Sequence, residues 1–163
     1  YTGFLLGVVS AYPLWNNAIL PVLFVVSALS AGLAATSLVG LITDRERFEQ
    51  MWLIKKSHVI LSAIEMVVLA TMLIIVSSGS PEGAASVASL VSGQYAPMFW
   101  GGLVLLGLVA PFAIEGYPVF VARKVETSTT SMVVSVIGEG GVLVGGFMLR
   151  LLVILAALPV LYL

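Results

Sequence analysis

The chain has 163 residues and no cysteine; 60% of its residues are hydrophobic, 9% are charged, and the formal net charge is -1. Soluble domains are about 45–50% apolar and about 25% charged, so this chain has too few charges to cover a water-facing surface. With a mean hydropathy of +1.15, the composition excludes an ordinary soluble enzyme and a disordered segment, and the near-neutral charge gives no nucleic-acid footprint. It predicts an all-α integral membrane protein embedded in membrane lipid.

Residues 1–11 form an apolar run that is too short to span a bilayer. Because Tyr1 already lies within this run, we expect residues 1–11 to be the end of a preceding transmembrane helix in a longer polypeptide. Pro13 and the pair Asn16 and Asn17 then mark a turn before the next helix. Asparagine at this place is typical of a helix cap, with a contact to a bound ligand or a partner loop as the alternative.

Four longer apolar stretches follow, at about residues 18–42, 57–76, 96–121 and 132–161. At about 1.5 Å per residue, each is long enough to cross a hydrocarbon core of roughly 30 Å. The sequence therefore predicts a single four-helix transmembrane bundle over residues 1–163, plus the end of the preceding helix.

The connections between the spans differ in charge. The links at 43–56 and after the third span are basic, whereas residues 11–17 and 77–95 contain no Lys or Arg. The positive-inside rule then places the basic links in the cytoplasm and the 77–95 link, expected to be a flexible loop, outside. The aromatic residues at that outer level are Tyr12, Trp15, Tyr95, Trp100 and Tyr162. Residues 44–52 mix charges and apolar side chains, which fits a short interfacial turn or a solvated loop.

Small residues recur at helical spacing on two of the spans. Ser27, Ala31 and Ala35 lie four residues apart on the first span, and Gly141 and Gly145 form a GxxxG pair on the fourth. Such patterns let membrane helices approach closely, so we interpret both as packing faces and not as sites.

Four ionisable residues lie within the predicted spans: Glu65, Glu115, Glu139 and Arg150. A charge at mid-membrane costs about 2.5–3.5 kcal/mol or more, so these groups need partners or water. From the basic ends of their spans, the three carboxyls lie at a similar depth of about 9–12 Å, and Arg150 lies roughly 16 Å beyond Glu139. The pattern predicts an inner half-channel for protons or water that ends at an arginine; structural ion pairs between helices are the alternative.

The single histidine, His58, follows Lys55 and Lys56, which favours a surface or interface position, with proton collection as the alternative. One histidine and no cysteine exclude a bis-histidine haem, an iron–sulfur cluster and a thiolate metal site, with His/Met ligation as the alternative because the chain has 6 Met. We expect no metal in this chain, and the metal centres for any electron transfer in a partner. Pro111, four residues before Glu115, predicts a helix kink, with carbonyls freed to face a water cavity as the alternative.

Several segments together resemble the polysulfide reductase membrane-subunit family, also called NrfD/PsrC-like. The segments are YTGFLL at 1–6, PLWNN at 13–17, LPVLFVVSALSAG at 20–32, Glu65 in the second span, and GGFMLR at 145–150. The resemblance covers essentially the whole chain and is strongest in the first 35 residues.

The resemblance implies a cofactor-free membrane subunit with two four-helix bundles, of which this chain would be the second. It implies a multi-pass protein of the prokaryotic inner (plasma) membrane that exchanges electrons between menaquinone or ubiquinone and an iron–sulfur protein subunit. That subunit would connect to a molybdopterin or cytochrome subunit. The quinone would be held mainly by the preceding half, with Tyr1 and Thr2 the nearest residues here, and Glu65, Glu115, Glu139, Arg150 and His58 would suit proton conduction.

Two other functions remain open from the residues. A proton- or ion-coupled transporter would use the same buried charges for substrate movement, and a passive membrane anchor would use them only to lock helices together. In the first interpretation the chain belongs to an oxidoreductase complex of a respiratory chain and is not an enzyme alone.

Overall fold

The computed structural model describes residues 1–43, 52–117, 120 and 129–158, and these residues form helices and no strand. The elements are α1 (Thr2–Gly7), α2 (Ile19–Thr43), α4 (Trp52–Gly79), α5 (Pro81–Val91), η1 (Met98–Val109), α6 (Ala110–Gly116) and α7 (Thr129–Leu155). Four stretches among these residues are long and apolar enough to cross a membrane: α2, α4 from Leu53, η1 with α6, and α7 from Met132. The predicted all-α membrane bundle with four spans is confirmed.

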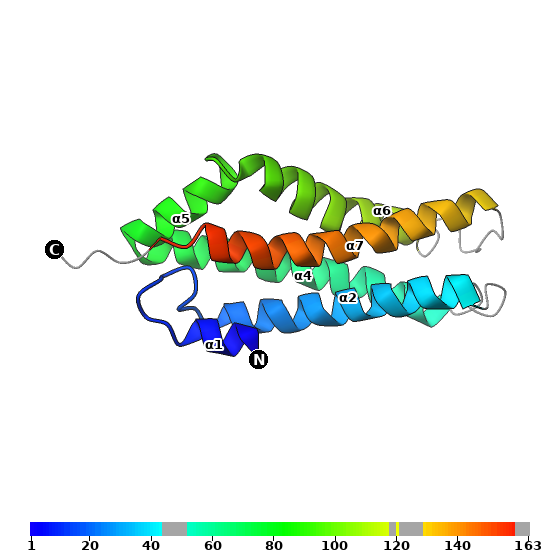
Figure 1. Ribbon diagram of the computed structural model, residues 1–163, viewed down its shortest axis with the longest axis horizontal. Helices are drawn as coiled ribbons and strands as arrows, with labels where there is room; N and C mark the ends of the chain where they lie inside the picture. Colours follow the sequence, from blue (N-terminus) through cyan, green and yellow to red (C-terminus); the bar gives the residue numbers. More distant parts are fainter. Residues whose placement is uncertain (44–51, 118–119, 121–128, 159–163) are drawn as a thin grey trace.

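The long helices run side by side along the long axis of the molecule, and α1 lies beside the start of α2 (Figure 1). Helix α7 packs against η1, α6 and α2, while α4 packs against α2 and α6. Helix α2 ends, and α4 and α7 begin, at the same end of the bundle. We call it the basic end, because Lys55 and Lys56 lie there. This arrangement brings α2, α4, α6 and α7 together around one polar interior.

The observed helices differ from the predicted spans at three boundaries. Helix α4 begins at Trp52 and not at 57, so Lys55 and Lys56 lie on the helix. Helix α4 ends at Gly79, beyond 76, and α7 ends at Leu155, short of 161. The α-helix α6 ends at Gly116, but Tyr117 and Phe120 are still π-helical, in agreement with a third span that reaches about 121. Hydropathy reports contact with lipid and not backbone hydrogen bonding, which is why it misses the start of α4, where Lys55 and Lys56 follow three apolar residues. Residues 44–51, Arg123, Lys124 and Tyr162, to which other predictions apply, lie outside the described residues.

The link at 77–95 is not a flexible loop, because most of it forms helix α5. The hydroxyl of Ser80 accepts a hydrogen bond from the backbone N–H of Gly83 at 3.0 Å, and Pro81 occupies the start of the helix. A serine cap followed by proline is a strong helix start. The hydroxyl of Ser86 accepts a hydrogen bond from the N–H of Leu158 at 3.1 Å, which ties α5 to the segment after α7.

The buried stripe of α4 changes character along its length. Toward the basic end it presents His58, Ser62 and Glu65, and after them Leu69, Met72 and Val76. These positions are three or four residues apart and therefore lie on one helix face. Since α4 packs against α2 and α6, the bundle interior is polar toward the basic end and apolar toward the opposite end. The apolar half includes Leu20, Leu23, Phe99, Leu103, Leu149 and Leu152.

Close packing of α7 on η1 depends on glycine. A side chain at Gly145 would run into the backbone of Gly107, and one at Gly141 would run into the carbonyl oxygen of Leu106. The predicted packing face at Gly141 and Gly145 is confirmed. The predicted face on the first span is not a single face, because Ala35 is exposed while Ser27 is buried.

Polar groups fix the end of the bundle opposite the basic end. The indole N–H of Trp15 donates to the carbonyl oxygen of Val153 at 2.8 Å, and that of Trp100 donates to Val91 at 2.9 Å. The Oδ1 atom of Asn17 accepts a hydrogen bond from the N–H of Ile19 at 2.8 Å, so the predicted cap of α2 is confirmed at this residue.

Candidate functional site

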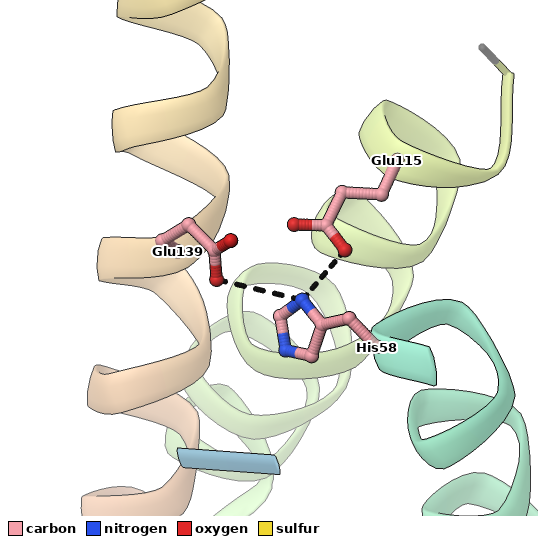
Figure 2. A group of neighbouring side chains, drawn as sticks. All are labelled: His58, Glu115 and Glu139. Carbon is pink, nitrogen blue, oxygen red and sulfur yellow. Dashed lines mark hydrogen bonds and ion pairs between the residues drawn. The ribbon is translucent and has the colours of Figure 1, made fainter. Parts of the chain in front are cut away.

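Three buried side chains from three helices meet in the polar half of the bundle. The Nδ1 atom of His58 on α4 lies 2.6 Å from Oε2 of Glu115 on α6, a hydrogen-bond distance, and 3.4 Å from Oε2 of Glu139 on α7. Figure 2 shows the three side chains pointing toward one another. They are 1%, 6% and 5% exposed, so the group is closed to lipid. We call these three residues the His58 cluster.

The expected surface or interface position of His58 is wrong. The neighbouring residues Lys55 and Lys56 suggested a water-facing segment, but His58 lies on the buried stripe of α4. Lys56, two residues before His58, is turned by about 200° from it, and Lys55, on the same side as His58, lies nearly one turn closer to the start of the helix.

Backbone geometry brings the two carboxyls to the histidine. The backbone N–H of Ala110 donates to the carbonyl oxygen of Leu105, five residues earlier, which is the hydrogen bond of a π-helix. Pro111 lies in the first turn of α6, where its missing N–H is tolerated. The third span therefore passes from π-helix to α-helix at Ala110, next to Pro111 and about one turn before Glu115. On α7, Gly138 and Gly141 flank Glu139 and pack against Ile114 and Leu106, so α7 comes close to η1 and α6.

Glu65 does not share the level of the other two carboxyls. It lies seven residues beyond His58 on α4, about 10 Å further from the basic end at 1.5 Å per residue. Its buried carboxyl faces the hydroxyls of Ser27 and Ser30 on α2 and interacts electrostatically with Arg150 and His58. We call Glu65, Ser27, Ser30 and Arg150 the Glu65 group. The predicted common depth is wrong because it took 57 as the start of a helix that begins at Trp52.

Arg150 lies at the side of the bundle, on α7. Its Nη1 atom donates to the carbonyl oxygen of Gly146 at 2.6 Å, and its guanidinium carbon is 5.7 Å from the ring centre of Phe24. It also lines a cavity of about 180 Å³ together with Tyr1, Thr2 and Phe24. The two residues that the family resemblance placed nearest to a quinone thus border the same cavity as the arginine.

The buried serine face of α2 was not predicted from the sequence. Ser27, Ser30 and Ser37 are each 1% exposed and occupy one face of the helix. Ser37 interacts with the carboxyl of Glu139, so the serine face borders both the His58 cluster and the Glu65 group. Their spacing of three and seven residues is the signal that could have revealed this polar face.

The His58 cluster has ligand atoms of the kinds that bind metals, and one such atom from each residue lies within 4.8 Å of the others. Two ligands of a tetrahedral zinc ion, each about 2.1 Å from the metal, lie roughly 3.4 Å apart. The 2.6 Å between His58 Nδ1 and Glu115 is instead a hydrogen bond. This arrangement fits a group that holds a proton better than a metal centre.

Two atoms of the cluster lack a hydrogen-bond partner among the described residues, namely Nε2 of His58 and Oε2 of Glu139. Both carboxyls face the Nδ1 atom of His58, so the imidazole can accept a proton at the unpartnered Nε2 atom and release another from Nδ1 to a carboxyl. The chemistry available here is proton transfer between buried acid–base groups.

The four membrane-spanning stretches and this closed polar interior define a multi-pass α-helical membrane protein. The chain belongs to the family described as "Polysulphide reductase, NrfD", whose model matches residues 1–161. It is therefore a membrane subunit of the NrfD/polysulfide reductase family, and bacterial relatives imply the inner membrane.

Three curated relatives are similar to the chain. The "Protein NrfD homolog" of Haemophilus influenzae is 28% identical over 158 residues, which cover 96% of this chain and 47% of that protein. The C subunit of the polysulfide reductase of Wolinella succinogenes is 32% identical over 120 residues, covering 71% and 37%, respectively. "Protein NrfD" of Escherichia coli is 29% identical over 160 residues, covering 96% and 48%. The chain thus spans about half or less of each relative's length, and no solved structure matches it.

Proposed function

We propose that the chain is the second helix bundle of a membrane subunit that exchanges electrons between a membrane quinone and an attached iron–sulfur protein. The proposal rests on the family membership and on the name of one relative, a subunit of a polysulfide reductase. Without cysteine, the chain has no thiolate to hold an iron–sulfur cluster, so electrons would pass to a partner subunit. That partner would hand them to a molybdopterin or cytochrome subunit.

The observation that carries the proposal further is the polar half of the bundle. It runs from the His58 cluster to the Glu65 group and borders a cavity at Arg150. We propose that protons move along it from the basic end, which the positive-inside rule predicts to face the cytoplasm. The apolar layer of Leu69, Met72 and Val76 closes the opposite end, so the route leaves the bundle at its side, near Arg150.

The cavity at Arg150 fits part of a quinone site. Arg150 offers hydrogen-bond donors for a carbonyl oxygen, and Phe24 offers an apolar wall. Because the chain spans about half or less of its relatives' length, we propose that the rest of such a protein supplies the walls beyond Tyr1 and Thr2. Bound there, menaquinone or ubiquinone would supply two-electron chemistry with uptake or release of protons.

The test uses the full-length protein with its partner subunits in proteoliposomes. Glu65→Gln and Glu115→Gln should each lower quinol-linked proton uptake by about tenfold or more, since a positioned acid–base group contributes about 10²–10⁴. Arg150→Met should lower uptake as well, because it removes the hydrogen-bond donors proposed for the quinone carbonyl. Glu82→Gln on α5, outside the polar interior, is the matched control. Unchanged uptake in all three variants would remove the proton route and leave a passive anchor.

A separate measurement addresses the redox role. The complex should copurify with an iron–sulfur protein and bind a quinol analogue. A protein that purifies alone, binds no analogue and moves ions across liposomes without a redox partner would instead be a transporter.

A further inference from the structure

Two buried hydroxyls on α2, those of Ser27 and Ser30, lack the backbone partner that several other helical hydroxyls of the bundle have. Thr36, Thr71 and Ser78 each donate to the carbonyl four residues earlier, at 2.7 to 2.9 Å. This is the usual way in which a helical serine or threonine satisfies its hydroxyl. Ser27 and Ser30 are almost fully buried and do not do this.

The hydroxyls of Ser27 and Ser30 face the Glu65 carboxyl closely enough to interact with it. Neither makes a hydrogen bond of ordinary length and angle to any described residue. Leaving a buried polar group unpaired costs about 1–3 kcal/mol, and buried water is the common partner of such groups. Both hydroxyls are therefore suited to hold water beside Glu65.

Most of the unpartnered buried atoms belong to the His58 cluster and the Glu65 group. Five such atoms occur in the described residues, and four belong to Ser27, Ser30, His58 and Glu139. Ser62, also buried, lies between His58 and Glu65 on the same stripe of α4. Ser62 therefore lies within the stretch of about 10 Å that separates His58 from Glu65 along α4.

We propose that Ser27 and Ser30 are positioning residues that hold a short chain of internal water between the His58 cluster and Glu65, and that this water carries the proton. The inference deepens the proposed function and rests on its proton route. Each water or hydroxyl that accepts a proton on one side releases one on the other. One proton therefore leaves at Glu65 for each that enters at the His58 cluster, and no group is consumed.

The decisive experiment compares alanine with glycine at both positions, in the full complex in proteoliposomes. Alanine leaves an apolar methyl at the site, whereas glycine leaves room for an additional water in place of the hydroxyl. We expect proton uptake to fall about tenfold or more in Ser27→Ala/Ser30→Ala. It should fall less in Ser27→Gly/Ser30→Gly.

Stability should follow the opposite order, because alanine is the best helix former and glycine among the poorest. A purely structural role for the serines would therefore make the glycine variant the worse one in every assay. Thr36→Ala on the same helix, which removes a hydroxyl bonded to its own backbone, should leave uptake unchanged.

The outcomes separate the two proposals. If the alanine variant matches wild type while Glu65→Gln loses uptake, the water chain is wrong and the proton route stands. If uptake simply follows stability, with glycine below alanine, the water chain is also wrong. If Glu65→Gln has no effect either, the proposed route fails and this inference fails with it.

Discussion

The imidazole of His58 and the carboxyl of Glu115, 57 residues apart in sequence, are joined by a 2.6 Å hydrogen bond inside the bundle. This contact joins α4 to α6 at a point where both side chains are buried. Its strength can be measured independently of any redox activity.

A double-mutant cycle on this pair should show strong coupling. Truncating one partner leaves the other buried and unpaired, so we expect His58→Ala and Glu115→Ala each to lower the free energy of unfolding by about 1–3 kcal/mol or more. The double variant should lose less than the sum, with a coupling of about 0.5–3 kcal/mol. Unfolding in mixed detergent micelles gives these values. Additive losses would show that the hydrogen bond contributes nothing beyond packing.

Glycine substitutions on α7 should separate tight from open positions. Gly145→Ala places a methyl against the backbone of Gly107 and should cost about 1–3 kcal/mol. Gly140→Ala on the same helix meets open space and should be neutral or stabilising by up to about 1 kcal/mol. Apparent melting temperatures in detergent provide the comparison. Equal melting temperatures for the two variants would argue against the close approach of α7 and η1.

Removing the cap of α5 should loosen this helix locally. Ser80→Ala deletes the acceptor for the N–H of Gly83 and should cost about 1 kcal/mol. Ser78→Ala, whose hydroxyl bonds to its own helix, is the matched control. Hydrogen exchange should accelerate across α5 in the first variant and stay unchanged in the second. Protection that is equal in both would mean that packing of Leu90 and the contact at Ser86 alone hold the helix.

The His58 cluster should hold no stoichiometric metal. The 2.6 Å separation of His58 and Glu115 is too short for two ligands of one metal ion and matches a shared proton. Elemental analysis of the purified protein, before and after treatment with a chelator, is the measurement. One tightly bound zinc, manganese or iron per protein molecule that disappears in His58→Ala would reverse this interpretation.

The number and type of the spans could be predicted from sequence, because lipid selects long apolar runs whatever the helices contact. The ends of the helices could not be predicted from hydropathy where polar residues continue a helix, as Lys55 and Lys56 do on α4. Ser80 and Pro81 are a strong local signal for a helix start, and they begin α5 within the segment that was expected to be a loop.

The members of the candidate site were predicted better than their grouping. Glu65, Glu115 and Glu139 stood out because charges in apolar runs are rare, and all three are buried. Which of them meet depends on helix rotation and on the close approach at Gly141, neither of which hydropathy reveals. Their roles, and those of Arg150, Tyr1 and Thr2, stay predictions.

The division of the interior into a polar and an apolar half has a consequence for membrane voltage. A potential falls mainly where the dielectric constant is low, so the layer around Leu69, Met72 and Val76 would carry most of it. Moving one charge through a full 100 mV costs about 2.3 kcal/mol. A proton that travels from the basic end only as far as Glu65 would cross a small part of that field. Turnover should therefore change little when the potential across the vesicle is imposed or collapsed.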